Sequence, residues 1–521
     1  MRGGDSRDHS IERRIIPTAR VNVPPITRYH PAMNGNHRPR KHDLDAIANR
    51  AMQQRGLWPV FSQDALDEAN RIARAPLRAD SGLADLRGLS WCSIDNDDSK
   101  DLDQLSVAIP AGDRTRILVA VADVASRVDK NSGIDRHASN NTTSIYTAAG
   151  VFPMLPLQLS NDVTSLNPQE ERAAIVIDMS VDAEGEVGES DVYRAVVVNQ
   201  AQLAYDSLAA WLEGHARAPE AVHAVKGLDE NVRLQDQVAQ RMKGRRHRAG
   251  ALSLETIEAR PVFDGEFLAD IHRDVKNRAK DMIEDFMVAA NGVTARFLAR
   301  KRFPSVRRVL DTPERWDRLT ELCAGLGGKL PPLPDGRALE QFLIRVRREK
   351  PERFPDISLC VVKLLGRGRY ALELPGHETA GHFGLAVRDY AHSTAPNRRF
   401  PDLITQRLLR AALAGEGVPY SHAELELLAG HCTDQEDNAT KVERQVAKSA
   451  AALLLEGRRG EQFDAIVTGA SEKGTWARIT HPTVEGKVVR GFEDLDVGDH
   501  VRVQLLDTDV ERGYIDFARV R

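Results

Sequence analysis

The stretch from Asp95 to Asp103 restricts the folds open to this chain, because it places five carboxylates in nine residues directly before apolar sequence that starts at Leu105. Carboxylates at this density repel one another unless a cation lies among them, and they are preferred ligands of hard ions such as Mg²⁺. An acidic metal site beside a buried strand is typical of phosphate chemistry. The competing interpretation is a solvated acidic loop, which is the default for an isolated cluster of charges.

The spacing of the acids favours a shared site. In an extended segment, side chains two positions apart lie on one face, so Asp101 and Asp103 are predicted to point together. Asp95 is too far along an extended chain to join them. It can do so only if the turn-prone residues 96–100 fold back.

A calcium-binding EF-hand loop is a third interpretation, since acidic or hydroxyl side chains alternate along the run. The sixth position of that loop needs glycine and the twelfth needs a bidentate glutamate. Lys100 and Ser106 occupy these positions, and no helical pattern leads into the run. We therefore set the EF-hand aside.

The bulk composition describes an ordinary globular chain. It has 521 residues, 28% of them charged, and a net charge of −4, so an RNA site would depend on local clusters such as the five Lys and Arg of residues 241–248. The four cysteines are far apart, which argues against a zinc ribbon and is consistent with a reducing cytoplasm. The sequence predicts no membrane span and no secretory signal.

The pattern changes along the chain in a way that predicts an α+β fold. We expect a mixed sheet with strands at 116–123, 174–179 and 194–199, surrounded by helices that dominate residues 200–455. The predicted parts are a disordered basic arm (1–40), a small helical module (41–80), a catalytic domain (81–456) and a C-terminal barrel (457–521). RNA binding and a plain tail are equally good interpretations of the arm.

The last segment has five short strand patterns within about sixty residues, which is typical of an OB-type barrel. The sequence of this segment resembles that of an S1-type RNA-binding domain. Exposed aromatic side chains of such barrels stack on bases while basic residues follow the phosphates. The candidates are Phe463 and Trp476, with Arg478, Lys487 and Arg490, although either aromatic side chain could instead fill the small core.

Several ordered sequence blocks resemble the RNase II/RNase R family, the RNB-domain exoribonucleases. The acidic run matches the family's entry motif, and four later blocks follow in the family's order. They contain residues 145–168, 245–255, 282–291 and 381–402. Chance agreement across five ordered blocks is negligible.

The resemblance implies a role for each matching residue. Asp95, Asp101 and Asp103 match the metal-binding and catalytic acids, and Arg398 matches the arginine that grips the reacting phosphate. The implied RNA contacts are Tyr146, which stacks on the 3′-terminal base, Leu254 in place of its usual aromatic partner, Tyr205 in substrate handling, Glu284 at a ribose, and Glu443 near the RNA end.

The resemblance thus implies a cytoplasmic 3′→5′ exoribonuclease that hydrolyses single-stranded RNA processively to 5′-mononucleotides. Its cofactor would be Mg²⁺ in a two-metal mechanism, with Mn²⁺ as an alternative, and no obligate protein partner is evident. The paired N-terminal cold-shock barrels common in the family are not recognisable, so we expect the helical module and the C-terminal barrel to form the RNA entrance.

The chain departs from the family at Gln104, which stands where the family has a fourth acid and is expected to complete the metal site. An amide oxygen can bind Mg²⁺ but adds no charge. The alternative function is therefore an RNA-binding pseudo-enzyme of the same fold. A protein-binding scaffold ranks lower, because it gives no reason for Asp103 and Arg398 within one ordered set of blocks.

Overall fold

The acidic run leads into a seven-stranded mixed sheet. The computed structural model describes residues 41–75, 82–255, 258–265, 267–274, 276–471 and 474–520. The predicted arm, residues 1–40, lies outside this part of the chain. The strand order is β1-β8-β7-β4-β3-β2-β9, with β1–β8 and β2–β9 parallel and the other neighbours antiparallel. The strands are β1 (Ala84–Asp85), β2 (Cys92–Asp95), β3 (Gln104–Ala111), β4 (Arg114–Ala122), β7 (Glu171–Val181), β8 (Val187–Val198) and β9 (Ala201–Ala204).

The central strands are apolar on both faces, which explains why they were readable from the sequence. Every residue from Ile117 to Ala122 in β4 is buried, and the middle of β7 is also largely buried. A strand covered on both faces has a continuous rather than alternating apolar run. The strands predicted at 116–123, 174–179 and 194–199 are confirmed as parts of β4, β7 and β8.

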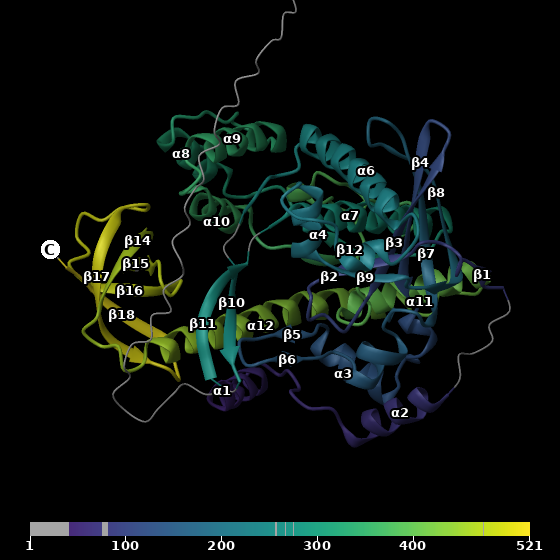
Figure 1. Ribbon diagram of the computed structural model, residues 1–521, viewed down its shortest axis with the longest axis horizontal. Helices are drawn as coiled ribbons and strands as arrows, with labels where there is room; N and C mark the ends of the chain where they lie inside the picture. Colours follow the sequence, from purple (N-terminus) through teal and green to yellow (C-terminus); the bar gives the residue numbers. More distant parts are fainter. Residues whose placement is uncertain are drawn as a thin grey trace, which may run out of the picture. The chain divides into compact units, whose positions relative to one another are not determined.

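Helices cover the sheet and make up most of the rest of the chain (Figure 1). They are α1 (Lys41–Gln53), α2 (Gln63–Arg74), α3 (Gly133–Asn141), α4 (Tyr205–Leu212), α5 (Glu220–His223), α6 (Leu228–Ala249), α7 (Arg278–Arg300), α8 (Trp316–Gly325), α9 (Gly336–Glu349), α10 (Phe354–Leu365), α11 (Phe400–Ala414) and α12 (His422–Leu455), with short turns η1 (Val124–Ser126), η2 (Leu159–Val163) and η3 (Phe383–Leu385). None of the helices in the described ranges is long and apolar enough to cross a membrane.

Three two-stranded sheets lie outside the main sheet and the barrel. They are β5 (Ile145–Tyr146) with β6 (Val151–Phe152), β10 (Glu258–Asp264) with β11 (Phe267–Asp274), and β12 (Ser305–Val309) with β13 (Arg369–Glu373). The β10–β11 hairpin was not predicted. Pro261 within β10 cannot donate a ladder hydrogen bond, and it hides the strand in a sequence reading.

The C-terminal segment forms a closed five-stranded barrel in the order β14-β15-β16-β18-β17, which confirms the predicted OB-type fold. The strands are β14 (Gln462–Ser471), β15 (Gly474–Ile479), β16 (Val484–Arg490), β17 (His500–Asp509) and β18 (Tyr514–Arg519). Gly486 permits closure, because a Cβ there would lie 2.5 Å from the Phe517 ring. The α+β fold class is thereby confirmed, while the predicted domain boundaries stay predictions.

A buried ion pair joins the barrel to the helical region. Both guanidinium ends of Arg478 in β15 donate to the Asp356 carboxylate in α10, at 2.8 and 3.2 Å. The side chains are only 17% and 5% exposed. Arg478 is therefore committed to holding the barrel in place, and the phosphate contact expected for it does not fit this arrangement.

We expect Arg478→Ala to lower the free energy of unfolding by about 3 kcal/mol, because it leaves the Asp356 carboxylate buried and unpaired. Urea unfolding monitored by tryptophan fluorescence measures the loss. The matched control is Arg502→Ala, which removes an exposed pair with Asp464 in the same barrel and should change stability little. Equal effects of the two substitutions would contradict the structural role of Arg478.

Candidate active site

Asp103 connects the acidic run to a distant turn of the chain. It lies just before β3 with a side chain only 3% exposed. One carboxylate oxygen accepts the backbone N–H of Asn397 at 3.0 Å, and the other lies 3.5 Å from Nε of Arg398. The two predicted catalytic residues are thus brought together from positions almost 300 residues apart.

The turn that carries Arg398 is held by buried side chains that the sequence analysis did not single out. Asp402 is fully buried, accepts the backbone N–H of Ala395 at 2.8 Å and pairs with Arg399. Thr164 donates its hydroxyl to the Asn397 side chain at 2.6 Å. These contacts fix the backbone of the turn from which the side chain of Arg398 extends. Their only sequence signal was membership of the quoted blocks.

The acidic run folds back on itself as the spacing required. The Ser99 N–H donates to the Asn96 carbonyl at 3.2 Å, which closes a turn after β2. The Ser165 hydroxyl accepts the N–H of Leu102 and donates to the carbonyl of Lys100, at 3.0 and 2.8 Å. Because Leu102 is buried in the core, its two acidic neighbours are directed away from the core and toward the site.

Burial makes the charged state of all three acids unfavourable. It raises the pKa of Asp95 and of Asp103 to about 7, although the positive charge of Arg398 opposes both shifts. Burial also raises the pKa of Asp101. The charge of Asp101 acts on both neighbours and adds to their shifts. A cation among these carboxylates would reverse the effect, because opposite charge favours the ionised form.

The donor atoms of the site fit a hard divalent cation. Three buried oxygens accept no hydrogen bond, namely Oδ2 of Asp95, Oδ2 of Asp103 and Oε1 of Gln104. Oxygen donors of this kind suit Mg²⁺, which commonly uses one or two carboxylates and completes its shell with water and substrate phosphate. Accordingly, within the described ranges no group of three His, Cys, Asp or Glu side chains is arranged to hold a metal by itself.

Tyr146 lies at the edge of the acidic cluster and is placed by Glu443. The Glu443 carboxylate, from α12, accepts the backbone N–H of Tyr146 at 2.9 Å. The Tyr146 hydroxyl lies 3.5 Å from Oδ2 of Asp101. The residue remains 44% exposed, so its ring is available to a ligand. The structure thus brings two predicted RNA-binding residues together, with Glu443 in a positioning role.

Tyr205 lies on the other side of the acids, at the first residue of α4. The charges of Asp95 and Arg398 both act on its hydroxyl, whose pKa burial raises above the ordinary range. The ammonium group of Lys280 lies 5.9 Å from the ring centroid. Tyr205 therefore belongs to the same cluster as Asp95 and Arg398.

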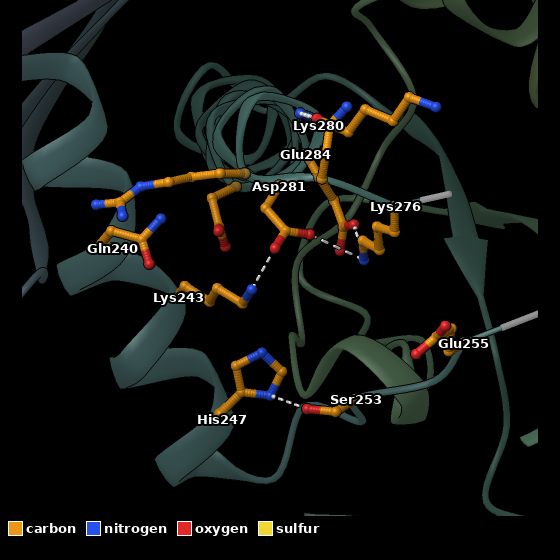
Figure 2. A network of polar contacts seen from close by, with 12 residues as sticks. Gln240, Lys243, His247, Ser253, Glu255, Lys276, Lys280, Asp281 and Glu284 are labelled. Carbon is orange, nitrogen blue, oxygen red and sulfur yellow. Dashed lines mark hydrogen bonds and ion pairs between the residues drawn. The ribbon is translucent and has the colours of Figure 1, made fainter. Parts of the chain in front are cut away.

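Glu284 lies in a separate network of charges between α6 and α7. Its carboxylate pairs with Lys276 at 2.6 Å and with Arg246 at 3.5 Å, and Lys276 also pairs with Asp281 at 3.3 Å. Figure 2 shows the Glu284 and Asp281 carboxylates directed toward Lys276. A ribose contact by Glu284 would have to compete with these cations, and it stays a prediction.

Two predicted RNA contacts pack with apolar cores, Phe463 inside one and Leu254 at the edge of another. Leu254 packs against the cluster formed by α8, α9 and α10. Phe463 is 7% exposed within the barrel core, so the stacking role expected for it is corrected. The inward side of β14 must fill a small barrel, and a phenylalanine there satisfies this need.

Of the two aromatic residues predicted to stack, Trp476 meets the geometric requirement. It lies on the outward face of β15 and is partly exposed. It pairs across the strands with Lys487, whose ammonium group lies 6.0 Å from its ring. Lys487 and Arg490 are exposed on β16. An aromatic ring beside free cations is a suitable surface for single-stranded nucleic acid.

The comparison with known families identifies this arrangement. Residues 83–415, more than half of the chain, match the RNB domain. The chain belongs to the RNB-domain family. Residues 461–520 match the RNase II-type exonuclease C-terminal S1 domain. The resemblance drawn from the acidic run and the later blocks is confirmed.

Curated relatives agree with this assignment. Ribonuclease R of Escherichia coli strain K12 is 30% identical over 513 residues, which cover 91% of this chain and 62% of the relative. Ribonuclease R of Vibrio cholerae serotype O1 is 29% identical over 515 residues, covering 91% and 61%. The RNB-domain chain therefore spans about three fifths of the length of these relatives.

Solved structures show the same fold. Mycoplasma genitalium RNase R, in complex with ribose-methylated single-stranded RNA, superposes with a TM-score of 0.80. The match covers 92% of this chain and 78% of that chain, at 23% sequence identity.

We expect Mg²⁺ to raise the thermal unfolding midpoint of the protein, because a ligand that binds only the folded state stabilises it. Asp103→Asn keeps the shape of the side chain but removes its charge, so the Mg²⁺-dependent increase should shrink. Differential scanning fluorimetry with Mg²⁺ and with a chelator measures both. Asp98→Asn, an exposed acid of the same run, is the control. An unchanged Mg²⁺ response in Asp103→Asn would contradict metal binding by Asp103.

Proposed function

We propose that the chain is a 3′→5′ exoribonuclease that hydrolyses single-stranded RNA processively to 5′-mononucleotides, with Mg²⁺ in a two-metal mechanism. The observation that carries this proposal is the convergence of Asp95, Asp101, Asp103 and Arg398, with unpartnered carboxylate oxygens beside a guanidinium. Phosphodiester hydrolysis needs these two kinds of group together. The four cysteines, which are all free, are consistent with the proposed cytoplasmic location.

The reaction breaks the bond between phosphorus and the 3′-oxygen of the penultimate nucleotide. Water attacks the phosphorus, the terminal nucleoside leaves with its 5′-phosphate, and the shortened strand keeps a 3′-hydroxyl after gaining a proton. Asp95, Asp101, Asp103 and Gln104 would hold Mg²⁺, which would supply an activated water and neutralise charge on the phosphate.

Arg398 is suited to hold the reacting phosphate. Its side chain is 42% exposed, and only one edge of the guanidinium faces Asp103. A planar guanidinium can offer two parallel N–H groups to a phosphate, which lysine cannot do. Asp103 orients the group while the Asn397 N–H holds Asp103 in turn. The phosphate is thereby positioned before any bond changes.

Tyr146 and Tyr205 are suited to hold the terminal nucleotide. Stacking of a base on an aromatic ring contributes about 1–3 kcal/mol and tolerates any base. Tyr146 is fixed through its backbone by Glu443, and its hydroxyl is held beside Asp101. This arrangement favours end recognition without sequence preference.

We expect the protein to shorten a 5′-labelled single-stranded RNA stepwise in Mg²⁺ and to leave it intact with a chelator. Asp103→Asn should slow cleavage at least about a hundredfold, as removal of one preorganised charged group commonly does, while RNA affinity changes little. Denaturing gels and fluorescence anisotropy measure the two properties. Asp98→Asn should cleave like the parent protein.

Tight binding of RNA that stays intact in Mg²⁺ would overturn the proposed activity and leave the pseudo-enzyme. Cleavage that persists in Asp103→Asn would refute the role of Asp103.

Gln104→Asp should lower the Mg²⁺ concentration for half-maximal cleavage by roughly tenfold, equivalent to about 1.4 kcal/mol. The substitution adds a negative charge where a buried amide oxygen has no partner, and opposite charges attract strongly in a partly buried site. Titration of the cleavage rate with Mg²⁺ measures the shift. Gln104→Asn is the control for the shorter side chain, and equal curves for the two variants would show that charge at this position does not limit the reaction.

A further inference from the structure

A pocket rich in arginine lies at the end of α7, beside the paired strands β12 and β13. Its volume of about 460 Å³ is in the range of small-molecule sites. We call it the Arg307 pocket, after the most buried of the arginines that line it, which are Arg296, Arg300, Arg307 and Arg388. Three carboxylates complete the charged lining, and no residue that lines the pocket belongs to the acidic site.

Arg307 presents buried donors that the rest of the described chain does not satisfy. Its side chain is 3% exposed, and its Nη2 pairs with the Glu373 carboxylate. Nε and Nη1 are also buried, and among the described residues neither has a hydrogen-bond partner. The Asp389 carboxylate lies 3.6 Å from Nη1, which is too far for a hydrogen bond. A buried charged donor without an acceptor is costly, so a ligand that accepts from it would stabilise the site.

Arg296 adds a second guanidinium to the pocket. Among the described residues, no carboxylate lies within 4.0 Å of it. A Cβ at Gly292 would lie 3.2 Å from Nη1 of Arg296 and 3.3 Å from the Asp389 carbonyl oxygen, so the guanidinium lies over a glycine of α7 and close to the segment of Asp389. Burial lowers the pKa of Arg296, and the charges of Arg300 and Arg307 lower it further against the opposing charge of Asp389. An anion between these like charges would favour their ionised forms.

The wall of the pocket is fixed by hydrogen bonds to the backbone. The Glu373 carboxylate accepts the N–H and the hydroxyl of Thr379, at 3.1 and 2.9 Å. The N–H of Arg308 donates to the Tyr390 carbonyl at 2.8 Å, which keeps the neighbouring Asp389 beside β12. A ligand would therefore enter a preformed pocket.

The other two arginines lie at the rim and do not depend on a ligand. Arg300 is exposed in the last turn of α7, where a cation suits the helix end, and it donates to the Ser190 carbonyl at 3.4 Å. Arg388 pairs with Glu378, and both side chains are more than half exposed. Such an exposed pair contributes little to stability, so a ligand can displace it. The groups that remain to hold a ligand are Arg296 and Arg307.

The geometry and depth of these two groups select a terminal phosphate. A guanidinium offers parallel N–H groups that match phosphate oxygens. A phosphate ester carries a charge of about −1.5 to −2 at neutral pH and has three acceptor oxygens, so it can bind two guanidinium groups at once. A carboxylate brings one charge and two oxygens. A phosphate inside a nucleic-acid strand is flanked on both sides and does not fit against a side chain as buried as Arg307.

We propose that the Arg307 pocket binds a phosphate group, free or at the end of a small molecule, between the guanidinium groups of Arg296 and Arg307. Phe303 also lines the pocket and offers an apolar surface to the organic part of a phosphate ester. The proposal is independent of RNA hydrolysis, because no residue of the acidic site takes part.

The test is isothermal titration calorimetry of the full chain with inorganic phosphate, in a chelator so that no metal at the acidic site contributes. One phosphate per chain should bind, with a dissociation constant of about 1 mM or below. Arg296→Gln should weaken binding roughly tenfold or more, because it removes a charged donor. The matched control is Arg318→Gln, which neutralises an exposed arginine paired with Glu321 on α8 and should bind phosphate like the parent protein.

Two further variants locate the phosphate. Arg307→Lys keeps a positive charge beside Glu373 but loses the planar fork, so it should also weaken phosphate roughly tenfold. Arg398→Gln removes the arginine of the acidic site and should leave phosphate affinity unchanged. Thermal unfolding checks that each variant is folded, and Arg296→Gln decides alone if Arg307→Lys does not fold.

Two other ligands define the class and the source of the phosphate. Malonate, a dianion without phosphate, should bind at least about tenfold more weakly than phosphate. Adenosine 5′-monophosphate that binds as tightly as phosphate, or more tightly, indicates a phosphate ester as the ligand. Weaker binding of this nucleotide than of phosphate indicates free phosphate.

The phosphate site is overturned if the parent protein binds neither phosphate nor the nucleotide. Parental affinity in Arg296→Gln together with a loss in Arg398→Gln would place the phosphate at the acidic site and overturn it as well. Malonate that binds as tightly as phosphate would reject the ligand class. RNA cleavage in Mg²⁺ is measured separately, so its failure would leave this result unchanged.

Discussion

The structure of the site depends on one buried carboxylate. Asp103 accepts a backbone N–H from Asn397 and faces the guanidinium of Arg398, and it does so at the start of a central strand. A charge removed from water in this way is stable only with fixed partners. The pairing therefore determines how the turn before α11 meets the sheet, and with it the position of every group that could touch a phosphate.

The three acids of the site lie in surroundings that disfavour their ionised form. Burial raises the pKa of Asp95, Asp101 and Asp103, and one arginine only partly opposes it. This effect is confined to the site, because the surrounding strands are apolar and buried. Such a site gains most from an added cation, which would bind the three oxygens of the site that accept no hydrogen bond. Gln104 is the neutral member of that set.

The sequence predicted those features that residue types reveal. The apolar runs of β4 and β7, the barrel strands and the side-by-side placement of Asp101 and Asp103 follow from periodicity. The Asn397 contact could not be predicted, since a backbone N–H has no sequence signature. The sequence left the core and the surface open for Phe463, because an aromatic residue on a small barrel suits both equally well, and the structure places it in the core. The β10–β11 hairpin was not predicted, because Pro261 argues against a strand that nevertheless forms.

Helix α12 links the acidic site to the C-terminal barrel, since Glu443 fixes the backbone of Tyr146 and Lys448 lies against Gly513 of the barrel. These contacts are five residues apart, about 7.5 Å along a helix that rises 1.5 Å per residue. One helix therefore carries both the contact that places Tyr146 and the contact that seats the barrel loop. A displacement of α12 at the barrel would therefore be felt at Tyr146, so the barrel and the acidic site are mechanically coupled through one helix.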